Sequence, residues 1–302
     1  MSSTEAGIEV SSPVQGSLWL ADYAELTKPR ITALILMSTL VGFYLGSAAE
    51  LNFSLLLHTL LGTAFVASGT AALNQFWERD DDGKMLRTKD RPLPARRMQP
   101  WKALCFGVVL SAVGVLYLYA TANLLTSLLA ALTLVTYLFL YTPLKKRTPL
   151  CTLVGAFPGA IPPLIGWVAA RGDITLAAGI LYLILFLWQF PHFLSIAWLY
   201  REDYERGGIR MLPVLEPHGK QTGRQILLYC AALLPVSLLP SLLGVTGWVY
   251  LCGALILGVG FLHYGARAAM ARTKIQARRL LQASVIYLPL VYGLMMIDKI
   301  VP

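Results

Sequence analysis

Long apolar segments constrain the fold of this 302-residue chain more than any other feature. Each is about as long as the roughly 20 residues that an α-helix needs to cross a bilayer. Charged residues make up only 14% of the chain, whereas soluble domains contain about 25%. This excludes a single soluble domain, a disordered chain and a nucleic-acid-binding module, although the net charge is +9. The predicted transmembrane helices are 30–49, 53–73, 102–121, 124–141, 151–170, 175–199, 225–244, 247–265 and 280–298.

Basic residues lie almost entirely on one side of this nine-helix arrangement. Of the 25 Lys and Arg residues, all but Arg171 and Lys299 fall in alternate connections. Cytoplasmic loops carry the excess of Lys and Arg in membrane proteins. The pattern therefore predicts a multi-pass protein of the inner (plasma) membrane, with a cytoplasmic N-terminus and the C-terminus outside. The basic connections are 1–30, 74–102, 142–149, 200–224 and 266–279.

The connections on the predicted cytoplasmic side include the two longest, so we expect the functional site on that face. We predict one all-α domain, residues 1–302, in which nine transmembrane helices surround a central cavity that faces the cytoplasm. Residues 1–25 are expected to form a flexible cytoplasmic segment. The cysteines stand singly in apolar surroundings, which is typical of buried apolar residues rather than disulfides or metal ligands: Cys105, Cys151, Cys230 and Cys252.

Acidic residues follow the second apolar segment. If that helix continues past Leu73, Asn74, Glu78 and Asp82 form one stripe, because successive residues are 100° apart. Asp81 is as well placed as Asp82, whereas Asp80 points away. Mg²⁺ is usually held by one or two carboxylates together with water and substrate phosphates, and neighbouring bases would neutralise those phosphates. The stretch therefore predicts a diphosphate site; the alternative is a solvated interfacial loop. The neighbouring bases are Arg79, Lys84, Arg87, Lys89 and Arg91.

A second acidic patch, 200–206, follows the sixth apolar segment. Two such patches at one membrane depth could hold a diphosphate through two metal ions. Asp203 is the first choice for a metal ligand there and Glu202 the second; the alternative is an ordinary juxtamembrane mixture of charges.

Prolines interrupt the fifth segment, which therefore cannot form one straight helix. Irregular backbone inside a bilayer survives only where it is buried in protein or lines a cavity. The prolines are Pro158, Pro162 and Pro163.

Four motifs in the sequence resemble the UbiA superfamily of intramembrane prenyltransferases, in the version of the heme farnesyltransferases. The resemblance covers roughly residues 20–300. The motifs are Asn74-x-x-x-Glu78-Arg79-Asp80-x-Asp82 running on to Arg91-Pro92-Leu93, Tyr141-Thr142 with 144–149, the proline-rich stretch 159–167, and Trp188-x-x-Pro191-His192-Phe193 continuing to 203–214.

The resemblance implies an enzyme that transfers the farnesyl group of farnesyl diphosphate to the 2-vinyl group of heme B. Water adds in the same reaction, which gives heme O, and diphosphate is released. The resemblance further implies Mg²⁺ as cofactor, with Asn74, Glu78 and Asp82 as a first metal site and Asp203 as part of a second. The implied diphosphate ligands are Arg79, Arg87, Arg91, Lys145 and Lys146.

Two positions depart from the family pattern. Glu78 stands where most members have Asp, which retains the carboxylate but moves it by one methylene group. Asp203 is followed four residues later by Gly207, so the second metal site lacks a full acidic pair.

Histidines are of interest because heme is the implied acceptor. His192 could reach the heme iron or a propionate, or it could be a buried histidine hydrogen-bonded between helices. His58 and His263 also lie in apolar segments, without a supporting motif.

Two other functions compete with this prediction. A UbiA-type enzyme with another aromatic acceptor, such as 4-hydroxybenzoate, would share the first acidic motif but would not explain Pro191-His192-Phe193. A secondary transporter should carry carboxylates near the membrane midplane, whereas here the acids lie at the edge. The expected partners are the lipid bilayer and a heme A synthase or terminal oxidase assembly, with no nucleic acid.

Overall fold

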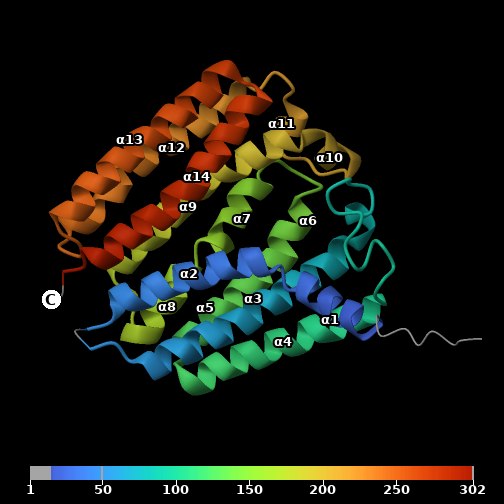
Figure 1. Ribbon diagram of the computed structural model, residues 1–302, viewed down its shortest axis with the longest axis horizontal. Helices are drawn as coiled ribbons and strands as arrows, with labels where there is room; N and C mark the ends of the chain where they lie inside the picture. The colour runs from blue at the N-terminus through green and yellow to red at the C-terminus, as the bar shows by residue number, and fades with distance from the viewer. Residues whose placement is uncertain (1–14, 49, 301–302) are drawn as a thin grey trace, which may run out of the picture.

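The computed structural model describes residues 15–48 and 50–300, which fold into a bundle of helices (Figure 1). The helices in chain order are α1 (Gln15–Leu26), α2 (Pro29–Gly46), α3 (Phe53–Asp82), α4 (Pro100–Thr121), α5 (Leu124–Val135), the π-helix η1 (Thr136–Tyr141), α6 (Thr142–Leu144), α7 (Cys151–Gly159), α8 (Pro162–Arg171), α9 (Leu176–Leu199), α10 (Arg201–Arg206), α11 (Leu212–Leu215), α12 (Lys220–Leu242), α13 (Trp248–Ala271) and α14 (Lys274–Ile297).

Nine helical segments of this described part are long and apolar enough to cross a membrane, and each matches one of the predicted segments. Two of them are composite: α5, η1 and α6 form the fourth, and α7 and α8 form the fifth. The second is α3, which continues without interruption to Asp82, as expected. The predicted all-α, multi-pass architecture is therefore confirmed.

The fifth segment is broken, as its prolines predicted. Helix α7 ends at Gly159 and α8 begins at Pro162. Helix α8 then packs directly on α2, because glycines remove the side chains between the two backbones. A Cβ atom on Gly166 would lie 1.9 Å from the carbonyl oxygen of Thr39, and one on Gly42 would lie 2.0 Å from that of Pro163. Small residues allow such close approach of transmembrane helices.

A π-helical turn interrupts the fourth segment just before a proline. The N–H of Thr142 donates to the carbonyl oxygen of Tyr137, five residues earlier. Pro143 has no N–H group and its ring would clash with a carbonyl of the preceding turn in regular α geometry. The wider turn relieves this conflict by accommodating one extra residue. It thereby sets the direction in which the residues after it face.

The two ends of the bundle are formed by different parts of the chain. Figure 1 shows α1 and α10 at one end, together with the connection 83–99, and the C-terminus at the other. We call the first the loop end. At the opposite end, Lys299 Nζ donates to the carbonyl oxygens of Tyr44 and Ser47, each at 2.7 Å. Helix α9 lies centrally and contacts α12 and α14.

Part of the N-terminal segment expected to be flexible is helical. Residues 15–26 form α1, and buried Leu26 packs with residues of the loop end. Arg97 donates to Asp22 at 2.8 Å and to Glu25 at 2.6 Å, which ties α1 to the connection 83–99. The rest of the segment, residues 1–14, lies outside the described residues.

Candidate diphosphate site

The last turns of α3 place oxygen-bearing side chains on one buried face. Asn74 and Asp82 are 1% and 2% exposed, and Glu78 lies between them on the same face. Asp81 is also buried, whereas the side chain of Asp80 is 83% exposed. The helical continuation therefore sorts the four acids as its periodicity predicts.

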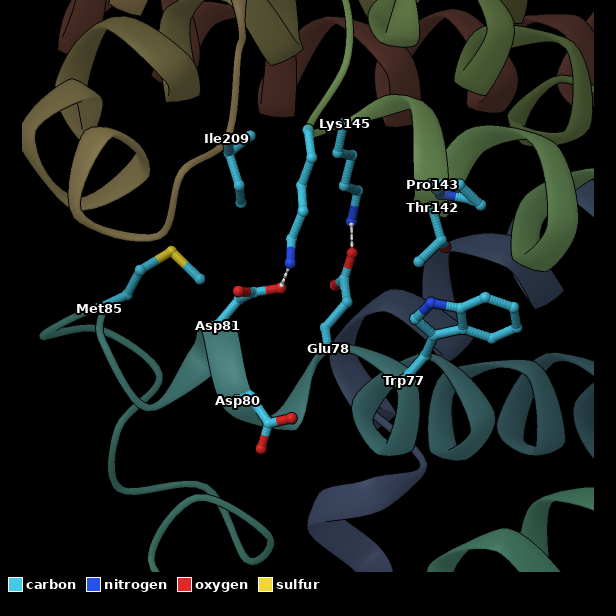
Figure 2. Close-up of a pocket in the computed structure, with 10 residues that line it drawn as sticks. Trp77, Glu78, Asp80, Asp81, Met85, Thr142, Pro143, Lys145 and Ile209 are labelled. Atoms are coloured by element: carbon cyan, nitrogen blue, oxygen red, sulfur yellow. Dashed lines mark hydrogen bonds and ion pairs between the residues drawn. The ribbon is translucent and has the colours of Figure 1, made fainter.

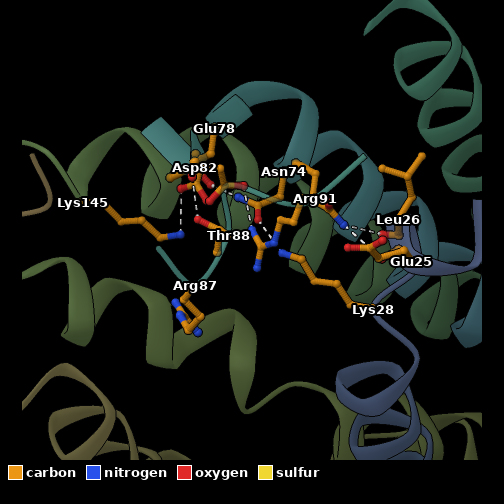
Figure 3. A network of polar contacts seen from close by, with 12 residues as sticks. Glu25, Leu26, Lys28, Asn74, Glu78, Asp82, Arg87, Thr88, Arg91 and Lys145 are labelled. Atoms are coloured by element: carbon orange, nitrogen blue, oxygen red, sulfur yellow. Dashed lines mark hydrogen bonds and ion pairs between the residues drawn. The ribbon is translucent and has the colours of Figure 1, made fainter. Parts of the chain in front are cut away.

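Each of the three side chains accepts a hydrogen bond from a base, and each base comes from a different part of the chain (Figure 3). Lys28 Nζ donates to Asn74 Oδ1 at 2.8 Å, and Lys145 Nζ donates to Glu78 Oε1 at 2.7 Å. The third base, Arg91, donates to Asp82 Oδ2 at 2.6 Å. Three side-chain oxygens, each paired with one cation, thus lie within one small site.

Lys28 is a site residue that the sequence analysis missed. It lies just before α2 in a left-handed conformation with φ 48°, which is uncommon for a residue other than glycine. The side chain of Gln75 fixes this turn by donating to the carbonyl oxygens of Glu25 and Leu26. Burial, with the charge of Arg91, lowers the pKa of Lys28 to about 7. The signal available in the sequence was a basic residue directly before Pro29, which the positive-inside bias explained equally well.

The π-helical turn supplies two further contacts. Thr142 Oγ1 accepts a hydrogen bond from Asn74 Nδ2 at 3.3 Å and donates to the carbonyl oxygen of Tyr137 at 3.0 Å. Lys145 follows one turn later, with its ammonium group 4.6 Å from the centre of the Tyr141 ring. Burial alone would lower the pKa of Lys145, but the charge of Glu78 holds it well above its usual value.

A pocket of about 140 Å³ opens beside this stripe (Figure 2). Glu78 and Asp81 line it from α3, while Lys145 and Lys146 line it from the segment after η1. Asp81 pairs with Lys146 at 2.5 Å. The volume is below the roughly 300–1,000 Å³ of pockets that enclose a drug-sized ligand. The two aspartates that the helical periodicity placed equally well differ in position: Asp81 lines the pocket, and Asp82 pairs with Arg91.

Asp203 joins α10 to the connection 83–99. It accepts hydrogen bonds from the backbone N–H groups of Leu86 and Arg87, at 3.0 and 3.2 Å, and pairs with Arg206. Burial raises the pKa of this carboxyl, but Arg206 and the two amides hold it below its usual value.

Arg87 is fixed between two aromatic rings. Its guanidinium lies 5.1 Å from the centre of the Tyr200 ring and 5.7 Å from that of Tyr204. Cation–π contacts of this kind hold the connection 83–99 against α10.

Arg79 does not join the group of bases around the stripe. Its guanidinium donates to the carbonyl oxygen of Phe76 at 2.8 Å and lies 3.8 Å from Asp80. His192 lies apart from the acids, between α9 and α14, where its Nδ1 is 2.8 Å from Ser284 Oγ and its ring stacks on Trp188.

The donor set fits Mg²⁺, with each carboxylate at present paired to a base. Within residues 15–48 and 50–300, no three Asp, Glu, His or Cys side chains converge on one point. The amide oxygen of Asn74 and the carboxylates of Glu78 and Asp82 are nevertheless hard oxygen donors on one face. Mg²⁺ takes only one or two carboxylates and fills its octahedron with water and phosphate oxygens.

Known proteins resemble the chain over nearly its full length. The model of the UbiA prenyltransferase family matches residues 35–287. A protein of Solibacter usitatus named protoheme IX farnesyltransferase is 54% identical over 289 residues, which cover 93% of this chain and 99% of the relative. A protein of the same name from Koribacter versatilis is 46% identical over 309 residues, covering 99% of each.

Solved structures share the fold at low sequence identity. A digeranylgeranylglyceryl phosphate synthase superimposes with a TM-score of 0.78 at 20% identity, over 92% of this chain and 98% of the other. A UbiA homolog from Archaeoglobus fulgidus bound to GPP and Mg²⁺ gives 0.66 at 15% identity, over 91% and 99%. Because the family match spans most of the sequence and the fold agrees, the chain belongs to the UbiA prenyltransferase family.

Proposed function

We propose that the chain transfers the farnesyl group of farnesyl diphosphate to the 2-vinyl group of heme B, with addition of water, and so forms heme O. The observation that carries the proposal is the alternation of Asn74, Glu78 and Asp82 with bases at the end of α3. Relatives named protoheme IX farnesyltransferase, which match along almost their entire length, support the choice of acceptor.

The bases of the site would bind the leaving group. When the bond between C1 of the farnesyl group and the diphosphate oxygen breaks, the electron pair leaves with diphosphate, and that charge must be neutralised. Lys28, Lys145 and Arg91 already lie at the stripe, and Lys146 lies at the pocket. Fixed charges of this kind stabilise a developing charge without reorganisation.

Mg²⁺ would be held by Asn74, Glu78 and Asp82, with Asp203 in a second site. The bound ion would supply further positive charge to the leaving diphosphate. The A. fulgidus homolog was solved with GPP and Mg²⁺, which supports a metal-dependent reaction. The ammonium groups of Lys28 and Lys145 would then exchange their hydrogen bonds to protein oxygens for hydrogen bonds to phosphate oxygens.

The farnesyl cation left by this step needs surroundings that exclude water. The rings of Tyr137 and Tyr141 lie 5.1 Å apart beside Lys145 and would form one wall. The π electrons of the vinyl group would then form the new carbon–carbon bond. A water molecule would add to the resulting cation and lose a proton.

His192 is proposed to bind heme. Its partner Ser284 donates its single hydroxyl proton to the carbonyl oxygen of Leu281 at 2.6 Å, so Ser284 Oγ accepts from His192 Nδ1–H. This tautomer leaves Nε2 with a free lone pair, which is the form that ligates iron. His192→Ala should reduce heme affinity and change the Soret absorption of the complex. Binding that is unchanged in affinity and spectrum would assign His192 to packing.

A direct assay tests the reaction. The purified protein is incubated with heme B, farnesyl diphosphate and Mg²⁺, and porphyrin masses are followed by liquid chromatography with mass spectrometry. We expect a product that carries one farnesyl group plus one water and that is absent when EDTA is added. If heme returns unchanged while 4-hydroxybenzoate is prenylated, the prenyl donor site stands and the heme acceptor is wrong.

Transport is disfavoured by the positions of the acids. Within the described transmembrane segments, carboxylates occur only at the loop end of α3. Coupling carboxylates of transporters lie near the midplane.

We further propose that the loop end is cytoplasmic and that the membrane is the inner (plasma) membrane. The one-sided distribution of Lys and Arg supports this orientation. A heme A synthase or terminal oxidase assembly is the expected recipient of the product.

A further inference from the structure

A groove runs between α13 and α14, separate from the diphosphate site. Its volume is about 450 Å³. Arg267, Arg279 and Gln282 line one part of it, and Ile256, Gly260 and Ile286 line the other. Both helices belong to the set that spans the membrane, so the groove faces lipid along an exposed side of the bundle.

The polar part lies near the loop end. Arg267 is four residues before the end of α13, and Arg279 is five residues after the start of α14. With a rise of 1.5 Å per residue, both are about 6–8 Å from the helix ends. Ile256 and Ile286 lie about 18–23 Å from those ends by the same rise. The groove is therefore charged at headgroup depth and apolar toward the midplane.

The two arginines have no counter-ion in the part of the chain that the structure describes. The side chains of Arg267 and Arg279 take part in no hydrogen bond or salt bridge there, and no carboxylate lines the groove. The nearby Glu202 pairs with Lys274 instead. Both arginines are exposed, and two cations that face one groove complement an anion.

The apolar part is open along its length. A Cβ atom built on Gly260 meets nothing within 4 Å, so the absence of a side chain there leaves a smooth floor. Ile256 and Ile286 are 72% and 59% exposed and form the sides. Such a surface suits a hydrocarbon chain that continues from the charged part.

We propose that this groove binds one anionic phospholipid, with its phosphate between Arg267 and Arg279 and an acyl chain along Gly260. Basic pockets between transmembrane helices on the cytoplasmic side are known to bind lipid headgroups. Positive-inside bias alone explains basic residues at this end, but it does not direct two arginines from different helices into one groove. By contrast, the neighbouring Arg278 is exposed and does not line the groove.

Lipid binding to the purified full-length protein tests the proposal. Native mass spectrometry measures the affinity for phosphatidylglycerol and, separately, for phosphatidylcholine. We expect phosphatidylglycerol to bind more tightly, and the double variant Arg267→Gln with Arg279→Gln to lose about tenfold or more of that affinity. Arg278→Gln removes a charge from the same end and should retain wild-type affinity.

A second variant tests the apolar part of the groove without changing any charge. Gly260→Leu places a bulky side chain in the apolar part, at a position where its Cβ atom meets no other atom within 4 Å. It should weaken phosphatidylglycerol binding while leaving the thermal unfolding midpoint without lipid unchanged.

Equal binding of the two lipids, or equal losses in Arg278→Gln and the double variant, would overturn the proposal. So would competition by inorganic phosphate that matches phosphatidylglycerol, because the acyl chain would then contribute nothing. A dimer that the double variant abolishes would assign the groove to a second copy of the chain, and lipid displaced by heme would assign it to heme.

Discussion

Each base beside the end of α3 donates a hydrogen bond to a protein oxygen, and we propose that it also binds a phosphate oxygen when substrate is present. Lys28 precedes α2, Arg91 lies in the connection 83–99, and Lys145 follows η1. Charges of opposite sign alternate, so the site avoids a large uncompensated field before substrate arrives.

The carboxylate of Glu78 should be essential for turnover. Glu78→Gln keeps the size of the side chain but removes the charge that pairs with Lys145 and would bind Mg²⁺. We expect turnover to fall about 10²-fold or more, as when one electrostatic group is removed from an active site. Initial rates of heme product formation at saturating Mg²⁺ measure this. Glu205→Gln removes the same charge from an exposed position in α10 that does not line the pocket, and should stay near the wild-type rate; equal losses in both variants would contradict the site.

The hydroxyl of Thr142 should tune metal dependence by positioning Asn74. Thr142→Val removes the group that accepts from Asn74 Nδ2 while preserving side-chain shape. Loss of one hydrogen bond should raise the Mg²⁺ concentration for half-maximal rate by about three- to tenfold. A Mg²⁺ titration of the initial rate measures the shift. Thr136→Val, at the start of the π-helix and bonded to the carbonyl oxygen of Leu132, is the control and should not shift it.

The sequence predicted which oxygen-bearing side chains share one face of α3 better than it predicted which bases contact them. Asn74, Glu78 and Asp82 share one helix, so periodicity alone places them together. Lys28 reaches them from 46 residues away through a left-handed turn, and no local pattern encodes that contact. Arg79 is also basic and directly follows Glu78 in the sequence, yet helical geometry turns its side chain toward Asp80.

Helix α8 makes its most extensive contact with one neighbour, α2. Its backbone touches α2 at Gly166 and Gly42, where any side chain would occupy the space of a carbonyl group. The sequence predicted a break in this segment from its prolines, but periodicity could not predict which helix would pack there.

A methyl group at this contact should destabilise the protein. Gly166→Ala places Cβ 1.9 Å from the carbonyl oxygen of Thr39, so the two helices must separate. We expect a loss of about 1–3 kcal/mol, typical of overpacking, seen as a lower thermal unfolding midpoint in detergent. Gly179→Ala, at a position on α9 where a Cβ meets nothing within 4 Å, should leave the midpoint equal or higher. A midpoint for Gly166→Ala as high as that of Gly179→Ala would contradict the close contact.

The start of α12 should be sensitive to acid. Glu216 accepts hydrogen bonds from the backbone N–H groups of Gln221 and Thr222, at 2.8–3.1 Å. Burial raises the pKa of its carboxyl, but these amides lower it below the usual 4.5. The stabilisation is therefore complete above the usual pKa and is lost as pH falls through the lowered pKa.

Glu216→Gln tests this pH dependence. At neutral pH the variant should lose about 1 kcal/mol, as when a helix cap is removed, and should unfold at a lower temperature than the wild type. The difference between the two should shrink as the pH is lowered through the carboxyl titration. Glu205→Gln, at an exposed position in α10, should match the wild type throughout. A difference that is constant with pH would exclude the carboxylate as its cause.

At the scale of the whole molecule, hydropathy and charge determine most of the architecture. All nine predicted segments are helices, and their number puts residues 28 and 299 at opposite ends of the bundle. The sequence could not predict the lateral arrangement, such as the central position of α9, because lipid-facing and protein-facing helices are both apolar.

The orientation in the membrane can be tested by labelling. In a variant whose four cysteines are replaced by serine, Asp173→Cys should react with a membrane-impermeant maleimide in intact cells. Lys89→Cys, in the connection 83–99, should react only after the membrane is permeabilised if, as we propose, the basic loops are cytoplasmic. The reverse labelling pattern would show that the chain is inserted the other way.

The π-helical turn at Thr136–Tyr141 has a consequence for evolution. Such a turn is equivalent to a one-residue insertion in an α-helix, so a natural deletion there would restore regular geometry and rotate all following residues by about 100°. The deletion would shorten the transmembrane segment by only about 1.5 Å, leaving its hydropathy and topology intact. It would nevertheless turn Lys145 away from Glu78. A relative could therefore keep every acid and every apolar segment and still lose this contact through the absence of one codon.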